Sequence, residues 1–427
     1  MTQPPFSITR RALLAATAVS GAVSLLPTAL KAKTGSAEIR PFKIEVPQAD
    51  IDDLRRRLAS TRWPDPETVG DQTQGVQLAT LQPLVQYWAT DYDWRKAEAK
   101  LNALPQFITE IDGLDIQFAH IRSKHANAMP LILTHGWPGS IFELIKVVEP
   151  LTNPTAHGGR EEDAFHLVLP TYPGYGFSGK PKKGDWAPPH VAMAWHELML
   201  RLGYKSYVAQ GGDWGAIISE LMAIQAPAGL LGVHTNMPGT VPPEIVQLVR
   251  TRQPAPENLS SDERAAYKSL DVFYNQGFGY AEMMNTRPQT LGYSLADSPV
   301  GMAGFYYEKF ATWSYTDGHP EKAFTKDEIL DAITLYWLTN TGASSSRSYW
   351  DAAQLGGGPF TRRTIKKVPV GVTVFPGEIY QAPKSWTEQS YENLIYFNKV
   401  DKGGHFAAWE EPELFAKELR ASFKSLR

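Results

Sequence analysis

The 427-residue sequence contains no cysteine. This excludes disulfide bonds, thiolate nucleophiles and cysteine-ligated metal sites. An excess of basic residues is also missing: the formal net charge is -3 at pH 7, which gives no electrostatic reason to expect nucleic acid or an anionic membrane as a partner. The sequence has no H-E-x-x-H helix, no Walker-type phosphate loop and no dinucleotide-binding glycine pattern after a strand. We therefore expect an enzyme without a metal or an organic cofactor.

Hydrophobic residues make up 43% of the chain, enough to bury a large core. Its length fits one large domain with an insertion, or two domains. Near the start, Ile51, Leu54 and Leu58 lie at helical spacing and predict a helix, which we expect Pro64 to end. We find no internal repeat.

The N-terminus differs from the rest of the chain. Arg10 and Arg11 precede a long uncharged, alanine-rich stretch, and this arrangement resembles a twin-arginine export signal. We expect residues 1–33 to be this signal, with cleavage after Ala29 or Ala32, and the mature protein to be periplasmic or secreted. The alternative is an uncleaved membrane anchor, for which the many small and hydroxylated residues make a weak span.

Further along, apolar runs typical of strands alternate with helical patterns, which favours a mainly parallel sheet flanked by helices. A hairpin turning at Asp112 and Gly113 precedes this alternation. Between residues 238 and 358 the alternation lapses into helix-like sequence rich in Trp and Tyr, an insertion that we expect to cover a site. The predicted strands are 107–111, 116–121, 131–134, 166–169, 204–209, 231–234, 368–375 and 393–398.

The run Gly211-Gly212-Asp213-Trp214-Gly215 places an aspartate where a serine hydrolase of the α/β-hydrolase class carries its nucleophile. A strand-like run precedes it and a helix-like run, 216–224, follows. Glycine neighbours permit the strained backbone of such a turn. A carboxylate there can attack an sp3 carbon without a base and form an alkyl ester, which water must then break. The alternative explanation is an ordinary Gly/Asp turn.

The second step needs a general base oriented by an acid. His405 follows the last predicted strand between glycine and phenylalanine, where the order nucleophile, acid, histidine places the base. Glu378 follows the preceding strand and is the expected acid. Its competitors are Asp401, which is too close in sequence to reach the imidazole easily, and Glu410 and Glu411, which begin the next helix.

A turn after the third strand completes the pattern. His135-Gly136-Trp137-Pro138 corresponds to the oxyanion loop, whose N–H pairs with that of the residue after the nucleophile. The expected oxyanion donors are thus the backbone N–H groups of Trp137 and Trp214. A plain Gly-Pro turn explains the glycine and proline but not the histidine and tryptophan beside them.

With these motifs together, the chain resembles the microsomal-type epoxide hydrolases of the α/β-hydrolase superfamily, from Pro41 to Arg427. The motifs that carry the resemblance are PFKIEVPQADIDDLRRRL, RWPD, HGWPGS, PGYGFSG, GGDWG, YAEMMNTRPQTLGYSLADSPVGMAGFYYEKFATW, FPGEI and GGHFAAWEEPE. The resemblance implies an α/β-hydrolase fold: a mostly parallel sheet flanked by helices, with a helical lid and an N-terminal extension.

The resemblance also implies a division of the chain. An N-terminal epoxide hydrolase segment would span residues 34–125, and the α/β-hydrolase core would span 126–237 and 359–427. The helical lid would span 238–358.

Site residues follow from the resemblance as well. The family's nucleophile, base and acid correspond to Asp213, His405 and Glu378. Its two lid tyrosines, which hydrogen-bond the epoxide oxygen, correspond to Tyr280 in GFGYAEMMNTRP and Tyr349 in SSSRSYW. Neutral phenols suit this task, because ring opening releases an alkoxide that needs a proton donor.

The resemblance implies that the protein converts an epoxide and water to a vicinal diol without a cofactor. Its partners would be the small-molecule epoxide and water, with no nucleic acid and no membrane beyond the export signal, and the lid of this family is compatible with a homodimer. Two alternatives stay open. A haloalkane dehalogenase also attacks carbon from an Asp-Trp elbow, and a catalytically silent protein on the same scaffold would bind a ligand only.

Overall fold

The computed structural model describes residues 37–356 and 358–427 of the chain. The export signal expected at residues 1–33, with its cleavage site, lies outside these residues. Within the described ranges, no helix combines the length and apolar character that a membrane crossing requires.

One sheet of nine strands organises the described part of the chain, in the order β1-β2-β3-β5-β4-β6-β7-β8-β9. β1, β2, β3 and β5 pair antiparallel, whereas the pairs from β5 through β4 to β9 are parallel. The strands are β1 (Arg40–Pro41), β2 (Gln106–Ile111), β3 (Leu114–Ile121), β4 (Met129–Thr134), β5 (Phe165–Pro170), β6 (Tyr207–Gly211), β7 (Leu230–Thr235), β8 (Val370–Val374) and β9 (Leu394–Lys399). The predicted mostly parallel sheet is confirmed.

Local details of the prediction hold to different degrees. The β2–β3 hairpin turns at Asp112 and Gly113, which have φ angles of 50° and 82°, as a tight hairpin turn requires. β6 begins at Tyr207, three residues later than predicted. The first helix, α1 (Gln48–Ala59), ends before Pro64, so the expectation that this proline ends it is wrong. The chain leaves the helix at Ser60 without needing a proline.

Helices cover the sheet in packed pairs. α4 (Ile145–Thr152) packs against α16 (Pro412–Ser422), and α5 (Pro188–Arg201) packs against α6 (Trp214–Gln225). The central strand β4 is apolar along its length, and Leu131, Ile132 and Leu133 are fully buried, as expected for a parallel strand covered on both faces. This rigid sheet supports the loops at its carboxyl edge.

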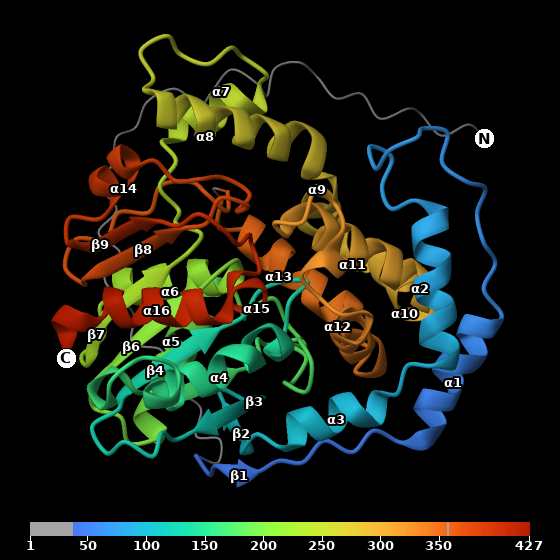
Figure 1. Ribbon diagram of the computed structural model, residues 1–427, viewed down its shortest axis with the longest axis horizontal. Helices are drawn as coiled ribbons and strands as arrows, with labels where there is room; N and C mark the ends of the chain where they lie inside the picture. Colours follow the sequence, from blue (N-terminus) through green and yellow to red (C-terminus); the bar gives the residue numbers. More distant parts are fainter. Residues whose placement is uncertain (1–36, 357) are drawn as a thin grey trace, which may run out of the picture. The chain divides into compact units, whose positions relative to one another are not determined.

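Seven α-helices of the described chain lie between β7 and β8 and form the lid (Figure 1). They are α7 (Pro243–Arg250), α8 (Ser261–Val272), α9 (Gly279–Thr286), α10 (Pro288–Asp297), α11 (Pro299–Trp313), α12 (Lys326–Leu338) and α13 (Gly342–Ala353). The lid's two ends lie side by side, because Val241 and Thr361 form a parallel bridge. A buried carboxylate of α6 fixes both ends: Glu220 accepts a 2.6 Å hydrogen bond from the N–H of Gly239 and pairs with Arg363.

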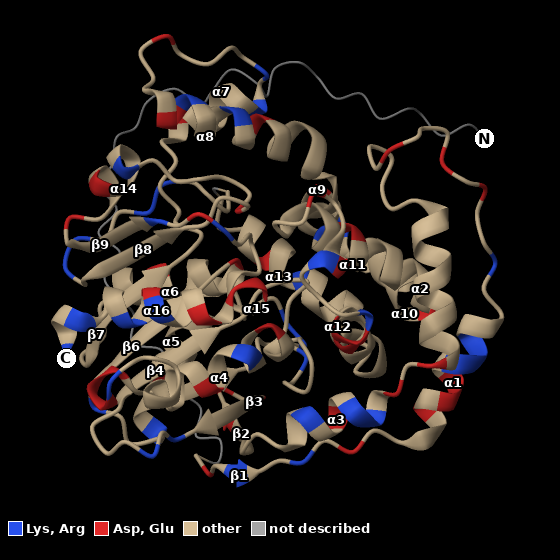
Figure 2. Ribbon diagram, viewed as in Figure 1, with Lys and Arg blue, Asp and Glu red and all other residues tan. Residues whose placement is uncertain are grey.

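The N-terminal segment packs against the lid. Its helices α1, α2 (Leu78–Thr90) and α3 (Trp94–Asn102) contact α11 and α12, and Figure 1 shows them in blue beside the orange lid helices. Asp331 of α12 joins the two parts, accepting from the Tyr92 hydroxyl at 2.8 Å and pairing with Lys100 at 2.9 Å. In α1 the acidic residues precede the basic ones, and α3 also carries residues of both signs (Figure 2), consistent with the small net charge.

Candidate active site

The sharp turn between β6 and α6 presents Asp213. Its backbone adopts φ 50° and ψ -124°, a conformation that is strained for a residue with a side chain. The turn also needs a glycine two residues on, because a Cβ on Gly215 would lie 2.0 Å from the carbonyl oxygen of Thr134 in β4. The strand, turn and helix expected around this aspartate are all present.

A backbone N–H group holds the Asp213 carboxyl, and a second lies beside it in the chain. The N–H of Trp137 donates to Asp213 Oδ1 at 2.8 Å, and the Trp137–Pro138 peptide bond is cis. Trp214 is the first residue of α6, and N–H groups of a helix's first turn have no partner within the helix. Both predicted oxyanion donors therefore lie next to the aspartate.

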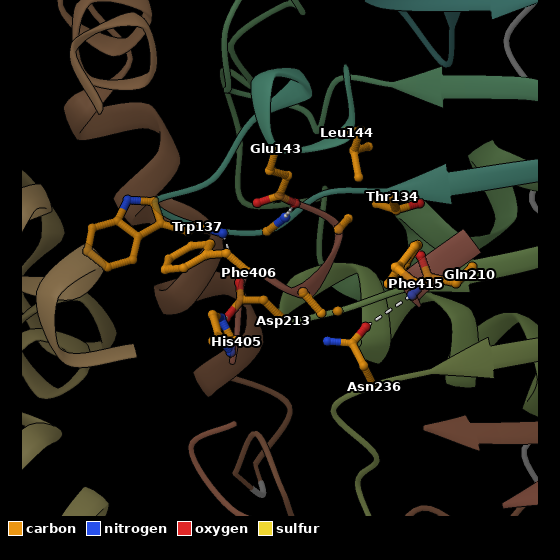
Figure 3. A pocket seen from close by; sticks show the side chains of 14 residues that line it. Thr134, Trp137, Glu143, Leu144, Gln210, Asp213, Asn236, His405, Phe406 and Phe415 are labelled. Carbon is orange, nitrogen blue, oxygen red and sulfur yellow. Dashed lines mark hydrogen bonds and ion pairs between the residues drawn. The ribbon is translucent and has the colours of Figure 1, made fainter. Parts of the chain in front are cut away.

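His405 connects Asp213 to Glu378 (Figure 3 shows His405 beside Asp213). Its Nε2 lies 3.3 Å from Asp213 Oδ2, and its Nδ1 lies 2.6 Å from Glu378 Oε1. The side chains of His405 and Glu378 are each 1% exposed. Glu378 is itself held by the N–H of Ile379 at 2.8 Å and by the amide of Asn236 at 3.4 Å. The structure thus brings the three predicted residues into one line.

The two carboxylates decide the charge of His405. Burial by itself lowers the pKa of an imidazole, but the attraction of Glu378 and the hydrogen bond to Asp213 outweigh it and leave the pKa of His405 well above its usual 6.5. In the free protein the imidazole is therefore protonated at neutral pH. Loss of the Asp213 charge would lower its pKa.

The competing acids lie elsewhere. Glu410 accepts from the N–H groups of Tyr315 and Phe406, and burial raises its pKa to about 7. Glu411 pairs with Lys402. Asp401 is exposed. Among these candidates, only Glu378 accepts a hydrogen bond from the imidazole.

Tyr280 of α9 and Tyr349 of α13 meet above Asp213 in one aromatic group. Their ring centroids are 5.9 Å apart. Tyr280 stacks on Trp137 at 5.3 Å, and Tyr349 meets the Trp214 ring edge-on at 4.8 Å. Burial raises the pKa of both phenols well above 10, so they stay protonated over the whole neutral range. They are weaker acids than exposed phenols, yet reliable hydrogen-bond donors.

A pocket of about 330 Å³ opens in front of these residues. Asp213, Trp214, Tyr280 and Tyr349 line it together with apolar side chains of the lid. A mostly apolar pocket with a few converging polar groups is typical of a site for a small organic molecule. The aspartate and both tyrosines face the same space.

The sequence analysis did not single out one half-buried acid at this site, Glu143. It follows the Trp137 turn in the apolar run Ile141-Phe142-Glu143-Leu144. The presence of an acid in an apolar run could have identified it as a candidate site residue from the sequence. Burial and the nearby Asp213 charge raise the pKa of Glu143 to about 8, although His405 and a hydrogen bond from Gly136 oppose the shift. Glu143 is therefore largely protonated at neutral pH.

Comparisons with known proteins cover most of the chain. The family model described as "Epoxide hydrolase N terminus" matches residues 39–144, and that described as "alpha/beta hydrolase fold" matches residues 129–355. A protein of Stigmatella aurantiaca is 53% identical over 91% of this chain and 86% of its own length. Epoxide hydrolase 1 of Sus scrofa is 36% identical over 92% of this chain and 90% of its own. The crystal structure of juvenile hormone epoxide hydrolase from Bombyx mori superposes with a TM-score of 0.81 at 31% identity, covering 91% of this chain and 95% of that one.

Proposed function

Because this chain belongs to the epoxide hydrolase family of the α/β-hydrolase fold, we propose that it converts an epoxide and water to a vicinal diol through an ester on Asp213. The observation that carries this mechanism is the placement of Asp213 between two sets of groups. Tyr280 and Tyr349 face it across the pocket, and His405 with Glu378 lies behind it.

In the first half-reaction, a carboxylate oxygen of Asp213 attacks one epoxide carbon from the side opposite its C–O bond. That bond breaks, and the oxygen leaves as an alkoxide held by the hydroxyls of Tyr280 and Tyr349. The alkoxide gains a proton, and the protonated His405 loses one. The step therefore ends with a neutral ester, a neutral imidazole and no net change in charge.

In the second half-reaction, the neutral His405 removes a proton from water, whose oxygen bonds to Cγ of the Asp213 ester. The N–H groups of Trp137 and Trp214 stabilise the negative oxygen of the tetrahedral intermediate. The bond between Cγ and the alkyl oxygen then breaks, and His405 protonates the departing alkoxide to give the diol. The remaining proton of the water passes from the Asp213 carboxyl to His405, which is again charged beside the restored carboxylate.

Trapping the ester tests this proposal. Asp213→Ala is expected to abolish turnover of a chiral epoxide panel, because no ester can form. A substitution of His405 is expected to leave ester formation in place and to let the ester accumulate, which mass spectrometry of the quenched protein detects as added substrate mass. Multiple turnover at the normal rate by either variant would contradict the mechanism. Release of halide from haloalkanes without diol formation from epoxides would instead favour a dehalogenase.

We also propose export by the twin-arginine route, supported by the Arg10-Arg11 pair and the uncharged stretch after it. Replacing both arginines with lysine is expected to retain the protein inside the cell. Unchanged export in fractionated cells would contradict the proposal.

A further inference from the structure

A second, much smaller cavity adjoins Asp213. Its volume is about 30 Å³, enough for one or two water molecules at roughly 10–15 Å³ each. Its lining includes Gly136, Glu143, Asn236 and His405. Among the described residues that line this cavity and the 330 Å³ pocket, Asp213 alone is shared. The aspartate therefore stands between a large apolar space and a small polar one.

The carboxyl of Glu143 lies at this small cavity. Its Oε1 accepts from the N–H of Gly136 at 3.2 Å. Its Oε2 occupies the place where a side chain at position 139 would begin, since a Cβ added to Gly139 would lie 1.8 Å from that oxygen. Figure 3 shows Glu143 beside the Trp137 loop, above Asp213 and His405 in that view. The absence of a side chain at Gly139 thus leaves room for this carboxyl.

We propose that the small cavity holds the water that hydrolyses the Asp213 ester, and that Glu143 is the residue that positions it. This inference rests on the ester mechanism proposed above. Glu143 accepts one hydrogen of the water while Nε2 of His405 removes the other. The water oxygen then bonds to Cγ of Asp213, the bond from Cγ to the alkyl oxygen breaks, and His405 protonates the departing alkoxide. The remaining proton of the original water passes from the Asp213 carboxyl to His405.

The electrostatics of the site support this role. The charge of Asp213 is one cause of the raised pKa of Glu143, after burial. The protonated His405 opposes this shift, and ester formation removes both charges together. Before the ester forms, the neutral acid adds no second negative charge beside the nucleophile.

The two cavities also separate the reactants. The epoxide reaches the carboxylate from the large pocket, whereas the water lies against Cγ from the other side. Water in the small cavity can therefore attack the ester carbonyl carbon without occupying the space that the epoxide needs.

Single-turnover kinetics test the inference. Full-length enzyme in excess is mixed with styrene oxide as the probe, and quenched samples give the rates of ester formation and ester breakdown. Glu143→Gln and Glu143→Ala are expected to form the ester within about threefold of the wild-type rate and to hydrolyse it at least about tenfold more slowly. Gly139→Ala, which displaces the carboxyl without removing it, is expected to slow the same step. Glu149→Gln, an exposed acid on the following helix, is the matched control with both rates unchanged.

Three outcomes would overturn the inference. Ester breakdown at the wild-type rate in both Glu143 variants would show that this carboxyl does not position the water. Equal slowing of both steps would indicate a general structural role. If the wild-type enzyme forms diol but no ester at any time, both the ester mechanism on Asp213 and the role of Glu143 are wrong. If the wild type does form the ester, the Glu143 variants test the role of Glu143 independently of that mechanism.

Discussion

At the scale of single residues, the hydroxyls of Tyr280 and Tyr349 determine how easily the epoxide ring opens. Because burial keeps both phenols protonated, either one can donate to the developing alkoxide. Tyr280→Phe or Tyr349→Phe is expected to slow ester formation by about tenfold to hundredfold, and the double variant by more, as for the removal of donors that stabilise a developing negative charge. Rapid-quench measurement of ester formation checks this.

Ester breakdown should change little in these variants, because water attacks from the other side of Asp213. Tyr293→Phe is the matched control, since Tyr293 is 70% exposed on α10. Equal rates of ester formation in the double variant and the wild type would show that the tyrosines are not the donors.

The protonation of His405 depends on its two carboxylate neighbours. Glu378→Gln removes a charge that raises the pKa of His405, while the burial that lowers it remains. The pKa of His405 is therefore expected to fall in this variant, so that the imidazole loses its proton at a lower pH than in the wild type. NMR titration of the imidazole measures the shift, and the hydrolytic step should slow because the ring is a weaker and less well oriented base. An unchanged or raised pKa would contradict this account.

At the scale of elements, the close approach of α10 to α13 determines where Tyr349 lies. A Cβ on Gly292 of α10 would come within 2.6 Å of Ala343 Cβ in α13, so the two helices cannot keep their spacing with any larger residue. Gly292→Ala gains about 1 kcal/mol of helix propensity but overpacks the contact at a cost of about 1–3 kcal/mol. We expect a lower melting temperature together with slower ester formation.

Gly304→Ala in α11 is the control for this change. A Cβ at that position would lie 3.4 Å from Leu81 Cδ2, an ordinary contact. The melting temperature of this variant should equal or exceed that of the wild type. If both alanine variants melt alike, the spacing of α10 and α13 does not control lid stability.

The elements differ in how far the sequence predicts them. The parallel strands were predictable because β4 and its neighbours are short, continuous apolar runs, and the Asp213 turn because its glycines stand at fixed places. The contacts of the lid were not. No local pattern shows that Tyr280 stacks on Trp137, residues 143 positions apart, or that Glu143 folds back over the turn before it. Such contacts arise from packing between distant segments.

At the scale of the whole molecule, one buried carboxylate joins the lid to the core. Glu220 is fully buried and binds Gly239 at the start of the lid, Arg363 at its end and the Tyr391 hydroxyl at 2.6 Å. Glu220→Gln leaves the Arg363 guanidinium, whose side chain is 17% exposed, without its counter-charge. The expected loss is about 3–5 kcal/mol of unfolding free energy, measured by denaturant unfolding.

An exposed ion pair provides the comparison. Asp262 pairs with Lys399 at 2.6 Å, with side chains 58% and 41% exposed, so Asp262→Asn should change stability by at most about 1 kcal/mol. A loss in Glu220→Gln as small as that in Asp262→Asn would show that the lid is not held by this carboxylate.

The adjacency of the lid's two ends at the Val241–Thr361 bridge has a consequence for how such enzymes diversify. An insertion whose ends already touch adds little loop-closure entropy to the core that carries it. A helical cassette with the same end-to-end spacing can therefore be exchanged between Gly239 and Arg363 while β6, β8 and β9 continue to carry the nucleophile, acid and base. The exchanged lid must also carry a side chain that accepts hydrogen bonds from Tyr92 and Lys100, as Asp331 does in this protein. Substrate range and chemistry can then evolve as separate modules of one chain.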